Sequence, residues 1–248
     1  MIKYEHTKAV HNYNAAEEVV PLLIKWFSPQ KVVDVGCGIG TWLSVFEKYG
    51  VSEILGVDGD YVKKEQLTIS IEKFIGTNLE EPLKIDKQFD LVISLEVAEH
   101  LSESSADSFI DSICKLGDTV LFSAAIKTQG GQNHINEQRP NYWISAFKKR
   151  GYELFDVLRP VFWNNENVDW WYKQNMMIFT KNDLHKKELA AMYSFNGKHL
   201  VHPILFENRS YEANKHFNEI NRINEGNKAI SYYFNLFVKA LKMKLLKR

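Results

Sequence analysis

Three alternate glycines directly after a short apolar run constrain the fold more than any other feature. Residues 31–35, Lys-Val-Val-Asp-Val, are rich in β-branched side chains, as expected of a buried strand in a parallel sheet. Gly36, Gly38 and Gly40 then allow a tight turn and the close approach of a ligand to the backbone. A helical pattern begins at Thr41, so the turn meets a helix N-terminus. A strand, a glycine turn and a helix in this order predict a cofactor site.

Two classes of cofactor bind at such a turn. The dinucleotide fingerprint places a glycine or alanine three residues after its second glycine. Here the third glycine, Gly40, comes one residue early, and Thr41 stands at the fingerprint position. With Asp34 inside the strand, the segment instead resembles motif I of the class I methyltransferases, which use S-adenosylmethionine (SAM). A plain structural turn is the alternative.

The resemblance implies a Rossmann-like α/β fold, in which helices cover both faces of a mostly parallel central sheet. A chain of 248 residues with 45% hydrophobic content is sufficient for one large domain of this kind. We expect a SAM-binding methyltransferase domain over residues 1–180 and a helical C-terminal extension over residues 181–248. The sequence has no run of about 18 apolar residues and no apolar leader, which favours a cytoplasmic enzyme.

Later segments would complete the SAM site. A second predicted strand ends at Asp58, whose carboxylate suits both ribose hydroxyls of the adenosine, although an aspartate here also suits a simple turn. Relatives usually carry Asp-Leu after the third strand, where this chain has Asn78 and Leu79, so the adenine contact would use an amide oxygen. A loop-capping asparagine is the alternative. The implied cofactor contacts are Asp34, Gly36, Cys37, Gly38, Gly40, Trp42, Asp58, Gly59, Asn78, Leu79 and Leu95.

A Glu-x-x-Glu-His cluster follows the predicted strand at residues 91–93. Glu96, Glu99 and His100 would converge, because residues three and four apart share a helical face. Two carboxylates and an imidazole suit a divalent cation. The cluster resembles that of ubiquinone-biosynthesis O-methyltransferases and terminal small-RNA 2′-O-methyltransferases, in which it holds a metal together with one later histidine. The alternative is a metal-free methyltransferase in which Glu-His-Leu packs and caps the next helix.

A polar loop over residues 129–143 is expected to overhang the methyl group. Its Gly-Gly-x-x-His-x-Asn-Glu-Gln pattern at residues 130–138 resembles that of methyltransferases in bacterial surface-polysaccharide gene clusters. His134 would supply the remaining metal ligand or act as a general base, with Glu99 and His100 as further catalytic candidates. Magnesium, manganese, iron and zinc all stay open as the cation. A solvated loop histidine is the alternative.

Charge is distributed unevenly along the chain. Residues 181–248 hold 13 Lys or Arg against 6 Asp or Glu, a net charge of +7, which leaves 18 against 25, or −7, for residues 1–180. Proteins that bind nucleic acid usually carry a basic stripe, so we expect no nucleic-acid partner. With the loop resemblance, this favours a carbohydrate or nucleotide-linked surface-polysaccharide precursor as acceptor. RNA 2′-O-methylation and a non-catalytic SAM-binding partner protein are the alternatives.

Two further segments have more than one interpretation. Residues 163–172 combine aromatic side chains with Asn and Asp, which suits a wall for sugar rings or nucleobases, or equally a plug at the end of the sheet. Apolar residues repeat at helical spacing from Ile230 to Leu245, and lysines crowd the end of this segment. Such a basic amphipathic helix docks on the core, on a second subunit or on an anionic membrane surface.

Overall fold

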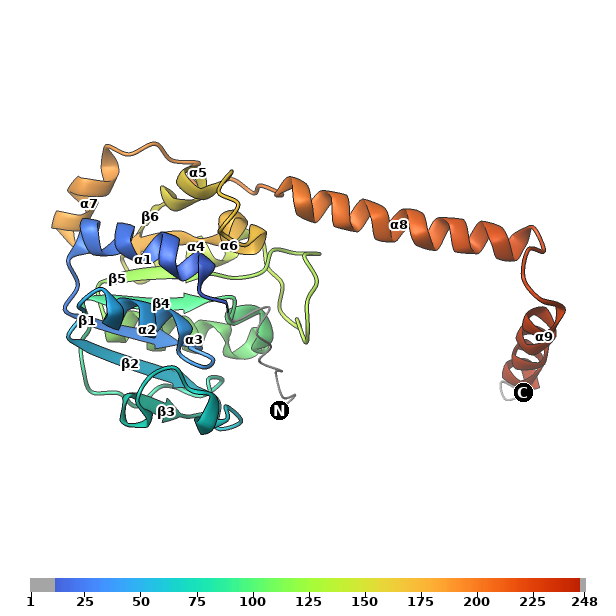
Figure 1. The fold of residues 1–248 in the computed structure, drawn as a ribbon, viewed down its shortest axis with the longest axis horizontal. Helices are drawn as coiled ribbons and strands as arrows, with labels where there is room; N and C mark the ends of the chain where they lie inside the picture. Colours follow the sequence, from blue (N-terminus) through green and yellow to red (C-terminus); the bar gives the residue numbers. More distant parts are fainter. Residues whose placement is uncertain (1–11, 246–248) are drawn as a thin grey trace. The chain divides into compact units, whose positions relative to one another are not determined.

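A seven-stranded sheet forms the centre of the first of two compact units in a computed structural model that describes residues 12–245 (Figure 1). The strand order is β3-β2-β1-β4-β5-β7-β6, and only β7 runs antiparallel to its neighbours. This arrangement confirms the Rossmann-like, mostly parallel fold. The strands are β1 (Lys31–Val35), β2 (Glu53–Asp58), β3 (Phe74–Gly76), β4 (Leu91–Leu95), β5 (Thr119–Ser123), β6 (Glu153–Phe155) and β7 (Met177–Thr180).

Helices cover both faces of the sheet because both faces are apolar. Successive strand residues point to opposite sides, so Val32 joins one hydrophobic cluster and Val33 joins the other. The first cluster includes side chains of α1, α2, α5 and α7, and the second includes side chains of α3 and α4. The helices are α1 (Asn14–Phe27), α2 (Thr41–Lys48), α3 (Glu103–Leu116), α4 (Pro140–Lys148), α5 (Leu158–Phe162), α6 (Trp170–Asn175) and α7 (Asp183–Ala190).

The carboxyl ends of β1, β2 and β4 lie at one edge of the sheet. From β1 the chain proceeds outward through β2 to β3, whereas β4 and β5 lie on the other side of β1. Open parallel sheets bind ligands at such a reversal of strand order. The glycine turn follows β1, Asp58 ends β2 and Glu96 follows β4, so the fold brings all three to this edge.

The chain forms two compact units that divide after His202, and the boundary after Thr180 between a methyltransferase domain and an extension stays a prediction. Helix α7 belongs to the first unit, because His185 Nδ1 lies 2.7 Å from Thr119 Oγ1 in β5 and its ring contacts Phe27 of α1. Asn182 caps α7, because its side-chain oxygen accepts hydrogen bonds from the backbone amides of Leu184 and His185.

The second unit consists of α8 (Pro203–Asn224) and α9 (Ile230–Leu245), as expected of a helical extension. Tyr233 of α9 donates from its hydroxyl to the Ile223 carbonyl at 2.8 Å, and Lys228 pairs with Glu219 at 2.5 Å, so the turn between the two helices is fixed locally. None of the helices in residues 12–245 is long and apolar enough to cross a membrane.

Candidate active site

A cavity of about 600 Å³ opens at the carboxyl edge of the sheet. Its walls come from the glycine turn, the ends of β2 and β4, the loop after β5 and the start of α6. These segments are far apart in sequence, and the order of the parallel strands brings them together. The cavity therefore unites the segments predicted to hold SAM with those predicted to hold a metal.

The glycine turn takes a backbone shape that favours glycine. The φ angles of Gly36, Gly38 and Gly40 are 88°, 55° and 87°, all in the left-handed region. A Cβ on Gly36 would also overlap the Val97 side chain, which follows β4. The turn thus packs closely beneath the cavity, and the N-terminus of α2 follows at Thr41.

Asp58 joins the ends of β1 and β2. Its carboxylate is buried and accepts hydrogen bonds from the backbone amides of Gly38 at 2.7 Å and Gly59 at 2.6 Å, and from the Tyr61 hydroxyl at 3.0 Å. A carboxylate has about four acceptor positions, so residues 12–245 leave about one of them unoccupied. A second ribose hydroxyl would have to replace the hydroxyl of Tyr61.

The structure separates the predicted cofactor residues into two groups. Gly36, Gly38, Asp58, Gly59, Asn78, Leu79 and Leu95 line the cavity. In the part of the chain that the structure describes, Asp34, Cys37, Gly40 and Trp42 lie away from its lining. The Cys37 sulfur packs against Gly56, Gly40 lies against Ile69, and the Trp42 ring contacts Tyr172. Asp34 lies inside β1, where burial and then the nearby Asp58 raise its pKa well above the usual value.

Asn78 makes the local bonds of a loop cap. Its side-chain oxygen accepts from the Glu80 amide at 3.2 Å, and its side-chain nitrogen donates to Glu81 at 3.0 Å. This geometry matches the capping alternative, although the residue also lines the cavity. Contact between Asn78 and the adenine stays a prediction.

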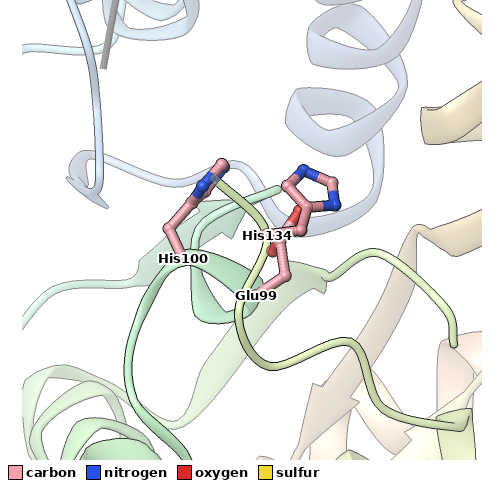
Figure 2. Close-up of side chains that lie close together, drawn as sticks. All are labelled: Glu99, His100 and His134. Carbon is pink, nitrogen blue, oxygen red and sulfur yellow. The ribbon is translucent and has the colours of Figure 1, made fainter. Parts of the chain in front are cut away.

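Glu99, His100 and His134 form a compact cluster beside the SAM region (Figure 2). One ligand atom from each residue lies within 4.8 Å of the other two, and the imidazole rings meet edge to face at 4.8 Å. Glu99 is fully buried, yet neither of its carboxylate oxygens has a hydrogen-bond partner among residues 12–245. A buried carboxylate without a partner is costly, so this set of donors fits a cation.

The charge state of the cluster also suits a cation. Burial raises the pKa of Glu99, and the charge of the neighbouring Glu96 raises it further, so a proton or a cation is needed to offset the two carboxylates. Burial, with a smaller effect of His134, lowers the pKa of His100 to about 4. The His100 imidazole is therefore uncharged at neutral pH, which is the form that binds metals.

Glu96 lies outside this cluster, contrary to the prediction of four converging ligands. The helical turn after β4 is a short 3-10 helix, η3 (Ala98–His100), and Glu96 precedes it in a left-handed conformation with φ of 55°. Its carboxylate instead accepts hydrogen bonds from Gln129 at 3.2 Å and Asn175 at 3.1 Å. Glu96 thus ties the loop after β5 to the end of α6.

The loop over residues 127–139 closes one side of the cavity, and we call it the lid loop. The backbone amides of Ile135 and Asn136 donate to the Glu99 carbonyl at 2.9 and 3.0 Å. A Cβ on Gly131 would overlap the His134 ring, so glycine is needed there for the ring's position. These contacts place His134 against Glu99 and His100.

Glu137 is a residue that the sequence interpretation missed. Its carboxylate accepts from the Thr128 amide at 2.7 Å and from the Gly130 amide, and it lies 2.9 Å from His134 Nδ1. With Nδ1 bound to a carboxylate, the other ring nitrogen of His134 is available to a metal or a proton. The only available signal was its position three residues after the histidine in the loop pattern.

Replacing Glu137 with glutamine should lower turnover by about 10- to 100-fold, because His134 loses the carboxylate that orients it. SAM affinity should stay within about twofold, since Glu137 is not part of the cavity lining. Steady-state kinetics and SAM titration measure the two effects. The exposed Glu207→Gln variant of α8 serves as control, and Glu137→Asp should recover part of the loss. Unchanged turnover in Glu137→Gln would show that the residue serves only the fold of the loop.

Residues 7–156 match the family model described as a methyltransferase domain. The chain belongs to this family. The match begins before α1 and reaches β6, so it includes the glycine turn, the Glu99 and His100 segment and the lid loop of this methyltransferase.

Two relatives of the chain carry methyltransferase names as well. The mitochondrial ubiquinone biosynthesis O-methyltransferase of Dictyostelium discoideum is 29% identical over 116 residues, which cover 39% of this chain and 36% of the relative. The probable chloroplastic tocopherol O-methyltransferase of Oryza sativa subsp. japonica is 38% identical over 84 residues, or 30% of this chain and 23% of the relative. The methyltransferase thus matches only about a third or less of the length of these relatives.

Solved structures share the fold. The methyltransferase domain of bacterial CtHen1-C is 21% identical, with a TM-score of 0.51 over 67% of this chain and 97% of that chain. SAM-bound CalS10, an amino pentose methyltransferase from Micromonospora echinaspora, is 10% identical, with a TM-score of 0.54 over 73% of this chain and 99% of that chain. At these identities the likeness concerns the fold, which is that of SAM-dependent methyltransferases.

Proposed function

We propose that this methyltransferase transfers the methyl group of SAM to an oxygen of a carbohydrate or nucleotide-linked glycan precursor, with the help of a divalent cation. One observation supports the proposal most strongly. The cavity combines a glycine turn of the SAM type with the Glu99, His100 and His134 cluster, so a cofactor and an activated acceptor would meet there.

The residues around the glycine turn fit SAM. Gly36 and Gly38 would allow the cofactor to approach the backbone, Asp58 would accept from the ribose, and Leu79 would pack against the adenine. The buried Asp58 carboxylate lines the cavity and accepts three hydrogen bonds from the described residues, which leaves about one acceptor position for a ribose hydroxyl.

The transfer is an in-line displacement. The acceptor oxygen attacks the methyl carbon as the carbon–sulfur bond breaks, and S-adenosylhomocysteine leaves. A bound divalent cation would favour the deprotonated acceptor by lowering its pKa. Glu99, His100 and His134 would hold this cation, and a set of two imidazoles and one carboxylate suits manganese, iron or zinc better than magnesium. The walls of the cavity would hold the two reactants in line.

The residues that line the cavity favour some classes of acceptor over others. Trp170 and Trp171 present aromatic rings beside the lid loop, which suits the apolar face of a sugar ring. Among the described residues that line the cavity there is no Lys or Arg, whereas Asp58, Glu80 and Glu96 are acidic. A phosphate would find no cationic partner there. We infer that the sugar of a nucleotide-linked precursor would enter the cavity while its phosphates stay outside, and that RNA is disfavoured as acceptor.

A panel of acceptors tests the proposal. Purified protein is incubated with SAM and with free, phosphorylated and nucleotide-linked sugars, and the products are examined by mass spectrometry. The proposal predicts that at least one sugar gains the mass of one methyl group. Methylation of RNA oligonucleotides with no sugar modified, or transfer to nitrogen alone, would contradict it. The Gly38→Val variant should give no product with any acceptor, which controls for background methylation.

A further inference from the structure

Helix α9 exposes a continuous apolar stripe. Within residues 12–245, no side chain of α9 is buried. Phe234 and Phe237 are each 64% exposed, and Leu241 and Leu245 follow at the spacing that keeps residues on one helical face. An exposed stripe of this size is costly in water and marks an interaction surface.

The charge around α9 has a single sign. Residues 226–248 contain six Lys or Arg and no Asp or Glu. The helical spacing places Lys242 and Lys244 on the two flanks of the Phe234 and Phe237 stripe, and Lys239 on the opposite side of the helix. A surface that accepts this helix must therefore be apolar beneath and negative around its edge.

An anionic lipid surface has both properties. Acyl chains cover the apolar face of an interfacial helix, while negative headgroups attract its lysines. A second copy of α9 offers the apolar face but no acid to pair with the lysines. Helix α9 has 16 residues and contains lysines, so it is too short and too polar to span a membrane. It would therefore lie at the interface between lipid and water.

We propose that α9 binds the surface of an anionic lipid bilayer, with the Phe234, Phe237, Leu241 and Leu245 stripe inserted among the lipids and its lysines among the headgroups. This inference rests on the second unit alone and does not depend on the proposed reaction. It assigns the unit the role of bringing the methyltransferase to a membrane surface.

Co-sedimentation of the full chain with lipid vesicles tests this proposal. The protein should bind vesicles of phosphatidylcholine mixed with phosphatidylglycerol, bind vesicles of phosphatidylcholine alone much more weakly, and dissociate as salt is raised. Changing both Lys239 and Lys242 to Gln should weaken binding by roughly 25-fold, about fivefold for each lysine. Changing both Phe234 and Phe237 to Ala should weaken it by at least about tenfold, since apolar insertion is lost.

A matched control uses the other helix of the same unit. Phe206 and Phe217 of α8 are 67% and 62% exposed, so changing both to Ala removes the same kind of side chain from a segment of mixed charge. This variant should bind anionic vesicles like the wild type. Circular dichroism checks that every variant stays helical, as expected because alanine favours helices.

Three results would overturn the proposal. Equal binding to neutral and anionic vesicles would remove the role of the lysines. Equal losses in the α8 and α9 variants would remove the role of the α9 stripe. Absence of binding, together with a change in molecular mass when Phe234 and Phe237 are replaced, would show that the stripe covers another protein surface, such as a second copy of the chain.

Discussion

Gly38→Val is expected to weaken SAM binding by at least roughly 100-fold, or about 3 kcal/mol. Gly38 has a φ of 55° and lines the cavity, so a valine there would strain the backbone and occupy space meant for the ligand. Isothermal titration calorimetry with SAM or S-adenosylhomocysteine measures the loss.

Gly50 provides the matched control for Gly38. Its φ is 91°, and a Cβ there would meet no atom within 4 Å, so Gly50→Val carries a backbone penalty without touching the cavity. This variant should be less stable yet keep its SAM affinity. Equal affinity in Gly38→Val and the wild type would place the cofactor elsewhere.

His134→Ala is expected to lower turnover by roughly 100- to 10,000-fold, because His134 either holds the cation or removes the proton of the acceptor. Removal of metal by EDTA should suppress turnover to a similar degree if a cation is used. SAM affinity should be nearly unchanged in both cases, since the glycine turn and Asp58 stay intact. The exposed His216→Ala variant of α8 controls for loss of a histidine.

The two roles of His134 give different results. If His134 is a base alone, His134→Ala loses activity but EDTA has no effect. If it is a ligand, manganese titration should show a site that is weakened in His134→Ala and in Glu99→Gln. Full turnover after exhaustive EDTA treatment, with no manganese site in the wild type, would remove the cation from the mechanism.

The sequence predicted the fold well because the signals were local. A β-branched run, alternate glycines and helical spacing each specify the backbone conformation of a few residues. The structure has β1, the glycine turn and α2 at the positions that these patterns predicted. The contacts of α7 with the sheet could not be predicted in this way. Helix α7 joins the first unit through the contact of His185 with Thr119, which are 66 residues apart in sequence.

The family resemblance, rather than helical spacing, predicted the residues that meet in the site. Glu99, His100 and His134 were expected to meet and do so, because the lid loop binds the Glu99 carbonyl. Glu96 was misplaced because its left-handed backbone turns the carboxylate toward Gln129 and Asn175. Residue spacing in the sequence does not predict a left-handed residue at this position.

Local packing explains the other differences between the predicted and the observed site residues. Asp34 and Cys37 lie in the cofactor segment but are buried and are not part of the cavity lining. Glu137 was missed because its role depends on how the lid loop folds back on itself. A sequence pattern gives the position of a residue in the chain, and only the packed loop decides which way it points.

Calorimetric titration of the wild-type protein with SAM and, separately, with NAD tests whether the cavity binds SAM as its cofactor. Both ligands carry an adenosine, so the comparison tests the distinction between SAM and a dinucleotide that was inferred from Gly40 and Asp34. We predict that SAM binds in the micromolar range, about −8 kcal/mol, and that NAD shows no measurable heat. Binding of NAD in preference to SAM would contradict the account.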